Sequence, residues 1–266
     1  MHTLVPTKAH KLYELARMDP ARNYFVCLTL DNHQTYLNTW QITQHDEPVF
    51  GLFLRKTGIL QMIKHPDTEL MSLADETSAI IRSISWKQAN ITTAFKDYLL
   101  FINPDYEVKE AAMIAALESK HYIPRHHDMK LRAVSLDTSH LPEVVTLYQR
   151  VFKSFASQSY MEEKLLSKRG RAVGLFMNHQ LIAVAQSDYE GGGKAVIVGV
   201  ATHPEYQGMG YGRACLEALV DQLLDAQMTL YLQYDSPTAG KLYESMGFKP
   251  FDRVYYVIND IIGDDL

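Results

Sequence analysis

Residues 200–213 are Val-Ala-Thr-His-Pro-Glu-Tyr-Gln-Gly-Met-Gly-Tyr-Gly-Arg, and this stretch decides the fold of the chain. It ends a strongly β segment, residues 195–201, and leads through a His-Pro turn into a helix expected over residues 210–226. Glycines at positions 208, 210 and 212 let the main chain curl so that its N–H groups converge. The unpaired N–H groups and the positive dipole end of the helix add to them. The stretch therefore predicts a pyrophosphate site built from backbone donors.

Other phosphate-binding loops fit this stretch less well. The chain has no Gly-x-x-x-x-Gly-Lys-Ser/Thr sequence, which excludes a P-loop NTPase. The spacing of the three glycines also differs from the Gly-x-Gly-x-x-Gly of dinucleotide-binding folds. The remaining alternative is a glycine-rich turn that only joins a strand to a helix. Glycine is concentrated around this loop, because Gly51 and Gly58 alone of the 14 glycines precede Gly170.

Outward from the loop, the C-terminal half predicts a mixed α/β layer with the order β-α-α-β-β-β-α-β-α-β. Pro142 suits the first turn of a helix, and Gly247 suits the position just after one. The expected strands are residues 130–136, 171–177, 181–188, 195–201, 228–234 and 254–258, and the expected helices are residues 142–155, 160–168, 210–226 and 237–246. The charge run 164–171 is expected to be an exposed helix face.

The N-terminal half predicts a second α/β domain by weaker patterns. Gly51-Leu-Phe-Leu54 and Gly174-Leu-Phe-Met177 each precede a turn and a second apolar segment, which indicates either a degenerate duplicate of one fold or a coincidence. The polar, proline-containing residues 121–128 are typical of a linker, so we expect domains over residues 1–125 and 126–266. In the first domain we expect helices at residues 6–18, 77–84 and 108–117, a strand at 24–30 and a hairpin at 49–63.

Composition narrows the possible partners. The chain is 47% hydrophobic and 21% charged, as in soluble globular proteins, and its net charge of −5 disfavours nucleic acid as a partner. No apolar run is long enough to cross a membrane, and the N-terminus lacks the apolar core of a secretory signal. Cys27 and Cys215 have no metal-binding spacing, and neither have His121, His126 and His127. We therefore expect a cytoplasmic protein without a metal.

Two segments together resemble a known family. Residues 207–212, Gln-Gly-Met-Gly-Tyr-Gly, resemble the acetyl-CoA signature Gln/Arg-x-x-Gly-x-Gly/Ala of the GCN5-related N-acetyltransferase (GNAT) superfamily. Residues 236–248, Ser-Pro-Thr-Ala-Gly-Lys-Leu-Tyr-Glu-Ser-Met-Gly-Phe, resemble its second signature, Asn-x-x-Ala-x-x-x-Tyr-x-x-x-Gly-Phe. The resemblance covers roughly residues 128–258, and the expected element order agrees with the GNAT fold.

The resemblance implies an N-acetyltransferase that uses acetyl-CoA as co-substrate. Tyr243 matches the tyrosine that protonates the departing thiolate, and an amide near Val200 would polarise the thioester carbonyl. The strand end would bind the pantetheine arm and the glycine loop the pyrophosphate. The residues implied in cofactor binding are Val200, Ala201, Thr202, Gln207, Gly208, Met209, Gly210, Tyr211, Gly212, Arg213, Ser236 and Ala239.

The sequence departs from the family pattern at two points. Ser236 replaces the asparagine that usually hydrogen-bonds the pantetheine. The strand at 195–201 also lacks the glutamate that many members use as general base, although a lysine-like amine is mostly protonated at pH 7. The base stays open among Asp188, Glu190, His203 and Glu205.

The resemblance leaves the acceptor undefined, because one scaffold can host many substrates. It implies a small-molecule or peptide amine, and Tyr234 is a candidate for touching it. The N-terminal domain is expected to shape the acceptor side or to form a homodimer. The alternative function is a non-catalytic acyl-CoA-binding module that regulates a partner.

Overall fold

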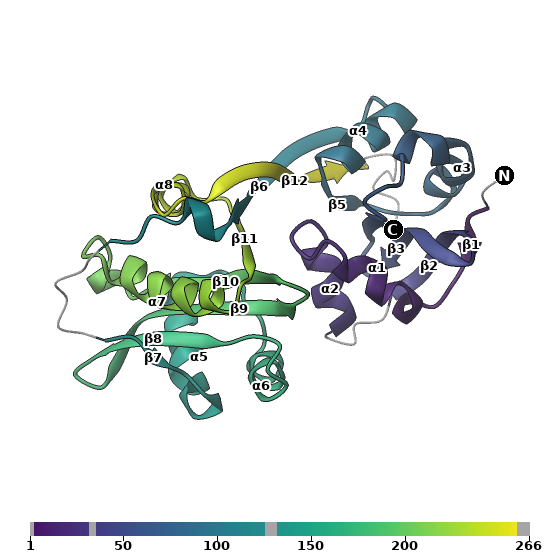
Figure 1. Cartoon of the computed structure of the whole chain (residues 1–266). Coiled ribbons are helices and arrows are strands. Elements are labelled where there is room, and N and C mark those ends of the chain that lie inside the picture. The colour runs from purple at the N-terminus through teal and green to yellow at the C-terminus, as the bar shows by residue number, and fades with distance from the viewer. Residues whose placement is uncertain (1–2, 32–35, 126–131, 260–266) are drawn as a thin grey trace. The chain divides into compact units, whose positions relative to one another are not determined.

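The computed structural model describes residues 3–31, 36–125 and 132–259 (Figure 1). The chain divides into two compact units. Unit 1 is Met1–Ile114 with Asp252–Leu266, and unit 2 is Ala115–Phe251. These units are bounded differently from the expected domains, 1–125 and 126–266, whose limits stay a prediction. Part of the expected linker, residues 126–128, and the first two residues of the expected strand 130–136 lie outside the described residues.

Unit 2 has the predicted order of elements. It consists of β7 (Val134–Ser135), α5 (Leu141–Val151), α6 (Gln158–Leu166), β8 (Ala172–Met177), β9 (Gln180–Gly191), β10 (Lys194–Thr202), α7 (Tyr211–Asp225), β11 (Thr229–Tyr234), α8 (Pro237–Ser245) and the start of β12 (Lys249–Ile258). The sheet order is β11-β10-β9-β8-β7, with the end of β6 (Glu107–Leu117) beside β11. The mixed α/β fold class is thereby confirmed.

The core of unit 2 lies on both faces of this sheet. Ala183 and Ala185 of β9 pack in one cluster with α7, whereas Val184 packs in another with α5. This follows from the alternation of side chains along a strand, since neighbouring residues point to opposite faces. Each buried large aliphatic side chain contributes about 1.5–3 kcal/mol, so the strand is fixed in register from both sides.

Unit 1 has the same order of elements as unit 2. It consists of β1 (Val5–Pro6), α1 (Tyr13–Arg17), α2 (Tyr24–Asp31), β2 (Tyr36–Gln44), β3 (Glu47–Arg55), β4 (Ile59–Lys64), α3 (Ala74–Ser83), β5 (Gln88–Thr92), α4 (Thr93–Ile102) and β6. Its sheet order begins β1-β2-β3-β4-β5, and β12 follows. The repeated order of elements supports a degenerate second copy of the fold. The Gly-Leu-Phe echo does not belong to this repeat, because its two segments lie in β3 and β8, and the counterpart of β3 in the repeated order is β9.

Two expectations for unit 1 were wrong. Residues 24–30, expected as a strand, lie in helix α2, and residues 108–117, expected as a helix, lie in strand β6. The apolar Phe-Val-Cys-Leu run suits a strand, but the Asn23 side chain donates to Ala16 O and the Cys27 N–H to Asn23 O, which turns the chain into a helix. The alanine-rich β6 segment has helical propensity that its place in the sheet overrides.

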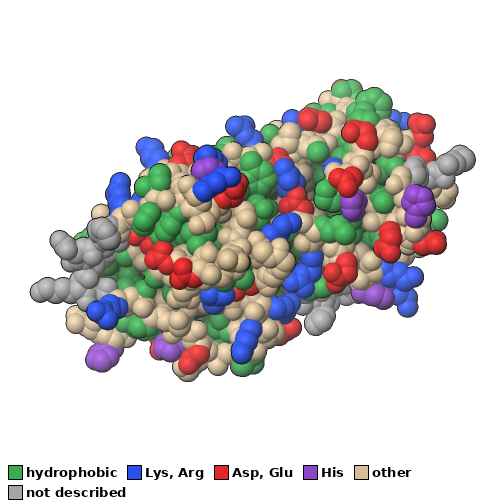
Figure 2. Space-filling view, viewed as in Figure 1, with side chains coloured by type: hydrophobic (Ala, Val, Ile, Leu, Met, Phe, Trp, Pro, Cys, Tyr) green, Lys and Arg blue, Asp and Glu red, His purple; other side chains and the backbone are tan. Residues whose placement is uncertain are grey.

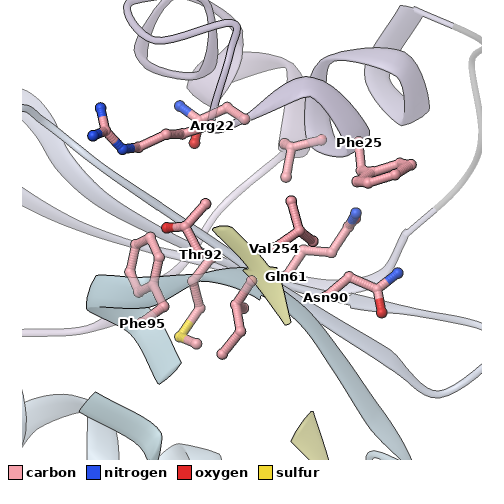
Figure 3. A pocket seen from close by; sticks show the side chains of 11 residues that line it. Arg22, Phe25, Gln61, Asn90, Thr92, Phe95 and Val254 are labelled. Atoms are coloured by element: carbon pink, nitrogen blue, oxygen red, sulfur yellow. The ribbon is translucent and has the colours of Figure 1, made fainter. Parts of the chain in front are cut away.

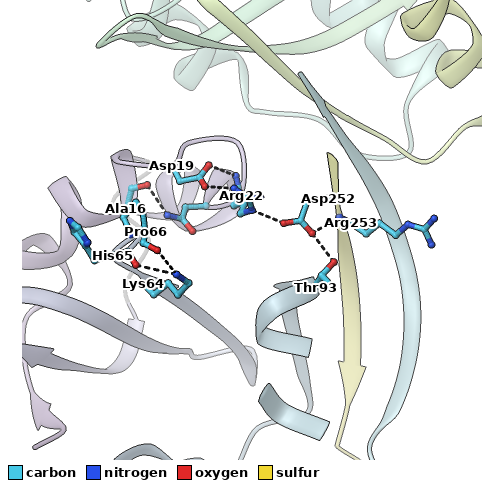
Figure 4. A network of polar contacts seen from close by, with 10 residues as sticks. Ala16, Asp19, Arg22, Lys64, His65, Pro66, Thr93, Asp252 and Arg253 are labelled. Carbon is cyan, nitrogen blue, oxygen red and sulfur yellow. Dashed lines mark hydrogen bonds and ion pairs between the residues drawn. The ribbon is translucent and has the colours of Figure 1, made fainter. Parts of the chain in front are cut away.

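Strand β12 begins in unit 2 and continues into unit 1. From Val254 to Ile258 it pairs antiparallel with β5, in a register that runs from Val254–Thr92 to Ile258–Gln88. Asp252, the first residue of β12 in unit 1, accepts hydrogen bonds from Arg22 (2.5 Å) and Thr93 (2.7 Å) (Figure 4). The final strand of the second element series is therefore anchored in the sheet of the first.

Three properties of the described residues are the distribution of surface charge, the length and apolarity of the helices, and the arrangement of possible metal ligands. Basic and acidic side chains are interspersed over the face shown in Figure 2. None of the described helices has the length and apolarity to cross a bilayer. Among the residues that the structure describes, no cluster of three His, Cys, Asp or Glu side chains is arranged to hold a metal.

Candidate active site

Strand β10 changes its pairing at the point where the family resemblance implies the reacting thioester. Its parallel register with β11 runs from Lys194–Thr229 to Ile197–Leu232. Its antiparallel register with β9 shifts between Val198 and Ala201, and Gly199 within this bulge has φ +58°. Because the β11 register ends before the bulge, the backbone of residues 199–202 is not held by β11 in the described chain.

The glycine loop after β10 is open. Gly208 and Gly210 have φ of +76° and +86°, and Gly210 is the N-cap of α7. A Cβ added at either glycine would meet no heavy atom within 4 Å. Gln207 closes the base of the loop, since its Nε2 donates to Thr202 O at 3.1 Å. The loop thus presents main-chain N–H groups and a helix N-terminus to open space, which is the arrangement that binds phosphate.

Tyr243 lies on α8 with its side chain 8% exposed. Its ring packs against Tyr234 and Phe248 at centroid distances of 5.5 and 5.9 Å. Burial raises the pKa of Tyr243 to about 12, because the charged phenolate is poorly solvated there. Its hydroxyl has no hydrogen-bond partner among the described residues, so the proton is available to a ligand.

Ser236 has a structural role at the N-terminus of helix α8. Ser236 is the N-cap of this helix, and its hydroxyl accepts from the N–H of Ala239 at 3.5 Å. Serine is a preferred N-cap residue, so this position serves helix α8 directly. Ser236 and Ala239, two of the residues implied in cofactor binding, thus lie together at one helix N-terminus.

The side chain of Arg213 is engaged within the protein. It is 6% exposed and pairs with Glu217, its neighbour one turn along α7, at 2.7 Å. It also donates to the Ser245 hydroxyl at 2.6 Å and to Ile123 O at 3.0 Å. Only the main chain of Arg213 therefore remains for a phosphate at the helix start. The i, i+4 spacing of Arg213 and Glu217 was the sequence signal for this pair.

Three of the four candidate bases are held by other groups. Asp188 accepts from the Tyr160 hydroxyl at 2.8 Å, and Glu190 forms an ion pair with Arg171 at 2.7 Å. His203 is 4% exposed, with Nε2 at 3.2 Å from Arg150 Nη1. The fourth, Glu205, is exposed in the short helix after β10. The structure does not gather these groups into one catalytic set.

The expectation that residues 164–171 form an exposed face was wrong for Lys164. Its side chain is 2% exposed, and its Nζ donates to Gln186 Oε1 of β9 at 2.8 Å. Burial lowers the pKa of Lys164, while Asp188 and Glu190 act in the opposite direction. The sequence pattern did not predict the burial of Lys164, because only the packing of α6 on β9 brings this lysine into contact with Gln186.

The corresponding loop of unit 1 has the opposite polarity. Strand β4 is followed by His65-Pro66, as β10 is followed by His203-Pro204. Lys64 Nζ donates to the carbonyls of His65 (3.2 Å), Pro66 (2.8 Å) and Thr68 (3.0 Å), as Figure 4 shows in part. This loop turns carbonyl oxygens toward an ammonium group, where the unit 2 loop presents N–H groups.

Unit 1 keeps a small pocket where β4 and β5 separate (Figure 3). The two strands pair in parallel at Ile59–Gln88 and Leu60–Ala89, and the next residue of β4, Gln61, lines the pocket. The pocket encloses about 10 Å³, enough for roughly one water molecule. Its lining also includes Arg22, Phe25, Asn90, Thr92, Phe95 and Val254.

Comparison with known proteins finds a matching family and several similar proteins. Residues 141–248 match the model of the "Acetyltransferase (GNAT) family". The chain is 31% identical over 139 residues to the [ribosomal protein bS18]-alanine N-acetyltransferase of Escherichia coli K12, a match that covers 47% of this chain and 87% of that protein. It is 30% identical over 71 residues to an uncharacterized N-acetyltransferase, ycf52, of Pyropia yezoensis, which covers 27% of this chain and 41% of that protein.

A solved structure matches nearly the whole chain. It is a tandem GNAT protein from the clavulanic acid biosynthesis pathway, with a TM-score of 0.66 and 14% identity. The match covers 99% of this chain and 100% of that one. At this identity the likeness concerns the fold, and it extends over both units.

Proposed function

Because the chain belongs to the GNAT family of N-acetyltransferases, we propose that it transfers an acetyl group from acetyl-CoA to a primary amine by direct attack. The observation that carries the proposal is the open loop of unit 2. Its glycines at 208 and 210 hold left-handed conformations, and the N-terminus of α7 follows. The pyrophosphate of acetyl-CoA binds the main-chain N–H groups of residues 207–213. Val200, Ala201 and Thr202 offer strand-edge groups to the pantetheine arm.

The reaction needs a donor at the carbonyl oxygen and a proton for the leaving group. The amine nitrogen attacks the thioester carbon, and the main-chain N–H of Val200 stabilises the oxyanion that forms. The C–S bond then breaks, and Tyr243 protonates the CoA thiolate. The amine releases one proton to the solvent, and Tyr243 regains one proton from the solvent after the thiol leaves, so the protons balance. Holding the two reactants together supplies much of the rate gain.

We propose one acetyl-CoA site per chain, in unit 2. In unit 1 the loop after β4 already holds the ammonium group of Lys64 with three carbonyls. A pyrophosphate there would face carbonyl oxygens and would have to draw Lys64 away from them. The pocket of about 10 Å³ between β4 and β5 also leaves no room for a pantetheine arm.

The acceptor we favour is an α-amino group of a peptide. An α-amino group has a pKa of about 7.7–8.0, against about 10.4 for lysine, so it needs a weaker base. This suits a site in which Asp188, Glu190 and His203 are all engaged. The Escherichia coli relative supports the same class of acceptor, because that enzyme is an N-acetyltransferase for an alanine of ribosomal protein bS18. A cytoplasmic location and a homodimer stay predictions.

The test is the release of CoA thiol from acetyl-CoA across a panel of amines. The panel contains an alanine-ended peptide, its N-blocked lysine counterpart, free amino acids, a polyamine and an aminoglycoside. We expect release that depends on the amine and is fastest with the free α-amine peptide. Acetyl-CoA binding without release by any amine would contradict the enzyme and favour a regulatory module.

A further inference from the structure

A chain of buried hydrogen bonds ends on the bulge of β10. The hydroxyl of Tyr148, on α5, donates to Gly199 O at 2.7 Å. The Tyr148 hydroxyl oxygen itself accepts from Gln186 Nε2 at 2.9 Å, and Gln186 Oε1 accepts from Lys164 Nζ at 2.8 Å. The three side chains are between 1% and 3% exposed. They come from α5, β9 and α6, all within unit 2.

The direction of every bond in this chain is fixed. A carbonyl oxygen can only accept, so Tyr148 must donate to Gly199 O. The Tyr148 oxygen then accepts from the Gln186 amide nitrogen, which turns the Gln186 oxygen toward Lys164. Burial raises the pKa of Tyr148, so that its hydroxyl keeps its proton. Bonds that run in one direction polarise one another and strengthen along the chain, by about 10–30% per bond.

The contact with Tyr148 requires glycine at position 199. Its φ of +58° favours glycine, and a Cβ at this position would overlap the hydroxyl of Tyr148. The absence of a side chain therefore lets Tyr148 reach the main chain of the bulge directly.

The bond to Gly199 O acts on the N–H of Val200, because both belong to one planar peptide unit. In a trans peptide the carbonyl and the N–H point in opposite directions, so a carbonyl held toward α5 directs the N–H away from it. An accepted hydrogen bond also makes the N–H of the same peptide a better donor.

We propose that Tyr148, supported by Gln186 and Lys164, is the positioning residue for the oxyanion-stabilising amide of Val200. The proposal rests on the proposed function, in which this amide faces the thioester carbonyl. Tyr148 does not touch the substrate. It holds the Gly199–Val200 peptide in one orientation before acetyl-CoA binds, so that no reorganisation is needed during the reaction.

The test reads the thioester directly and needs no acceptor. Acetyl-CoA labelled with ¹³C at the thioester carbonyl is bound to the full chain, and the carbonyl stretch is measured by infrared difference spectroscopy. A donated hydrogen bond lowers this frequency. In the wild type we expect a clear downward shift from free acetyl-CoA, and in Tyr148→Phe the loss of most of it. Tyr148→Phe keeps the ring that packs on Phe152 and Phe155 at 5.1 and 5.5 Å.

The control and the second variant separate positioning from general packing. Tyr160→Phe removes another buried hydroxyl of unit 2, bonded to Asp188, and should keep the wild-type frequency. Lys164→Met should lose part of the shift alone and nothing further on top of Tyr148→Phe, because the two residues act through one chain. With an accepted amine, Tyr148→Phe should lower kcat about tenfold and change the acetyl-CoA Kd less than about twofold.

A wild-type shift that persists in Tyr148→Phe and in Lys164→Met would overturn this proposal and leave the proposed function intact. Failure of the wild type to bind acetyl-CoA would instead remove the proposed function. A loss of the shift in Tyr160→Phe equal to that in Tyr148→Phe would also overturn the proposal, since the effect would not depend on the bond to Gly199.

Discussion

Replacement of Tyr243 by phenylalanine is expected to lower kcat by about 10²–10³-fold and to change the acetyl-CoA Kd by less than about twofold. The variant keeps the ring contacts with Tyr234 and Phe248 and removes only the hydroxyl. Without it the thiolate must leave unprotonated or take its proton from water. Steady-state kinetics with an accepted amine, together with acetyl-CoA titration, measures both values.

The matched control is Tyr234→Phe. Tyr234 packs against Tyr243 at 5.5 Å, but its hydroxyl donates to Glu244 at 3.3 Å. We expect kcat to stay within about threefold of the wild type, since this proton is not passed to the thiolate. A large loss in Tyr234→Phe with none in Tyr243→Phe would transfer the acid role to Tyr234.

The pKa of Tyr243 also predicts a pH profile. A hydroxyl with a pKa raised to about 12 stays protonated, and therefore competent as an acid, throughout the alkaline range in which the protein is assayed. The rate should rise as the amine loses its proton and then level off, without an alkaline decline near the ordinary tyrosine pKa of about 10. A decline at that pH in the wild type that is absent from Tyr243→Phe would contradict a buried, protonated acid.

Arg213→Met is expected to destabilise the protein by about 3–5 kcal/mol, because it leaves the Glu217 carboxylate buried without its cation. Both side chains are almost fully buried, at 6% and 7% exposure. The same substitution breaks the bonds to Ser245 and Ile123, which tie α7 to α8 and to the segment before unit 2's first helix. Urea unfolding followed by circular dichroism measures the change.

Two further variants test whether the loss of stability in Arg213→Met comes from the buried, unpaired carboxylate of Glu217. Arg213→Met combined with Glu217→Leu should recover much of the loss, since no charge is then left unpaired. Arg253→Met breaks the ion pair with Glu110, which has nearly the same length, 2.8 Å, but whose side chains are both 48% exposed. It should cost less than about 1 kcal/mol. Equal costs for Arg213→Met and Arg253→Met would show that burial does not set the value of the pair.

The parts of the fold that could be predicted are those with local signals. The glycines at 208, 210 and 212 specify a loop by backbone freedom alone, and the helix that follows begins at Tyr211 as expected within one residue. Periodicity located helix α5 of unit 2 because its apolar stripe, with Val144 and Leu147, is buried, and strand β9 because its long apolar run is buried on both faces. The matching element order of the two units supports a duplicate, whereas the Gly-Leu-Phe echo lies in β3 and β8, which are not equivalent strands of that order.

The structural features that could not be predicted depend on contacts between residues that are distant in the sequence. Strand β6 was expected as a helix because its pairing in the sheet overrides its helical propensity. Lys164 appears as one charge in a charged run, and only the packing of α6 on β9 brings it to Gln186. Tyr148 forms part of an apolar helical stripe, and nothing local indicates that its hydroxyl meets Gly199, 51 residues away. The sequence therefore predicted the conformation of the loop at residues 207–213 better than the contacts made at the bulge of β10.

The binding of the acetyl-CoA phosphates by residues 207–213 is tested most directly by calorimetric titration of three forms of the full chain with acetyl-CoA. Gly208→Asp and Gly208→Asn place side chains of nearly equal size in open space, and both residue types tolerate the φ of +76°. They differ by one negative charge beside the pyrophosphate. We predict one site per wild-type chain, at least about tenfold weaker binding in Gly208→Asp, and a much smaller loss in Gly208→Asn. Equal affinities of the Asp and Asn variants, or no binding by the wild type, would contradict the account.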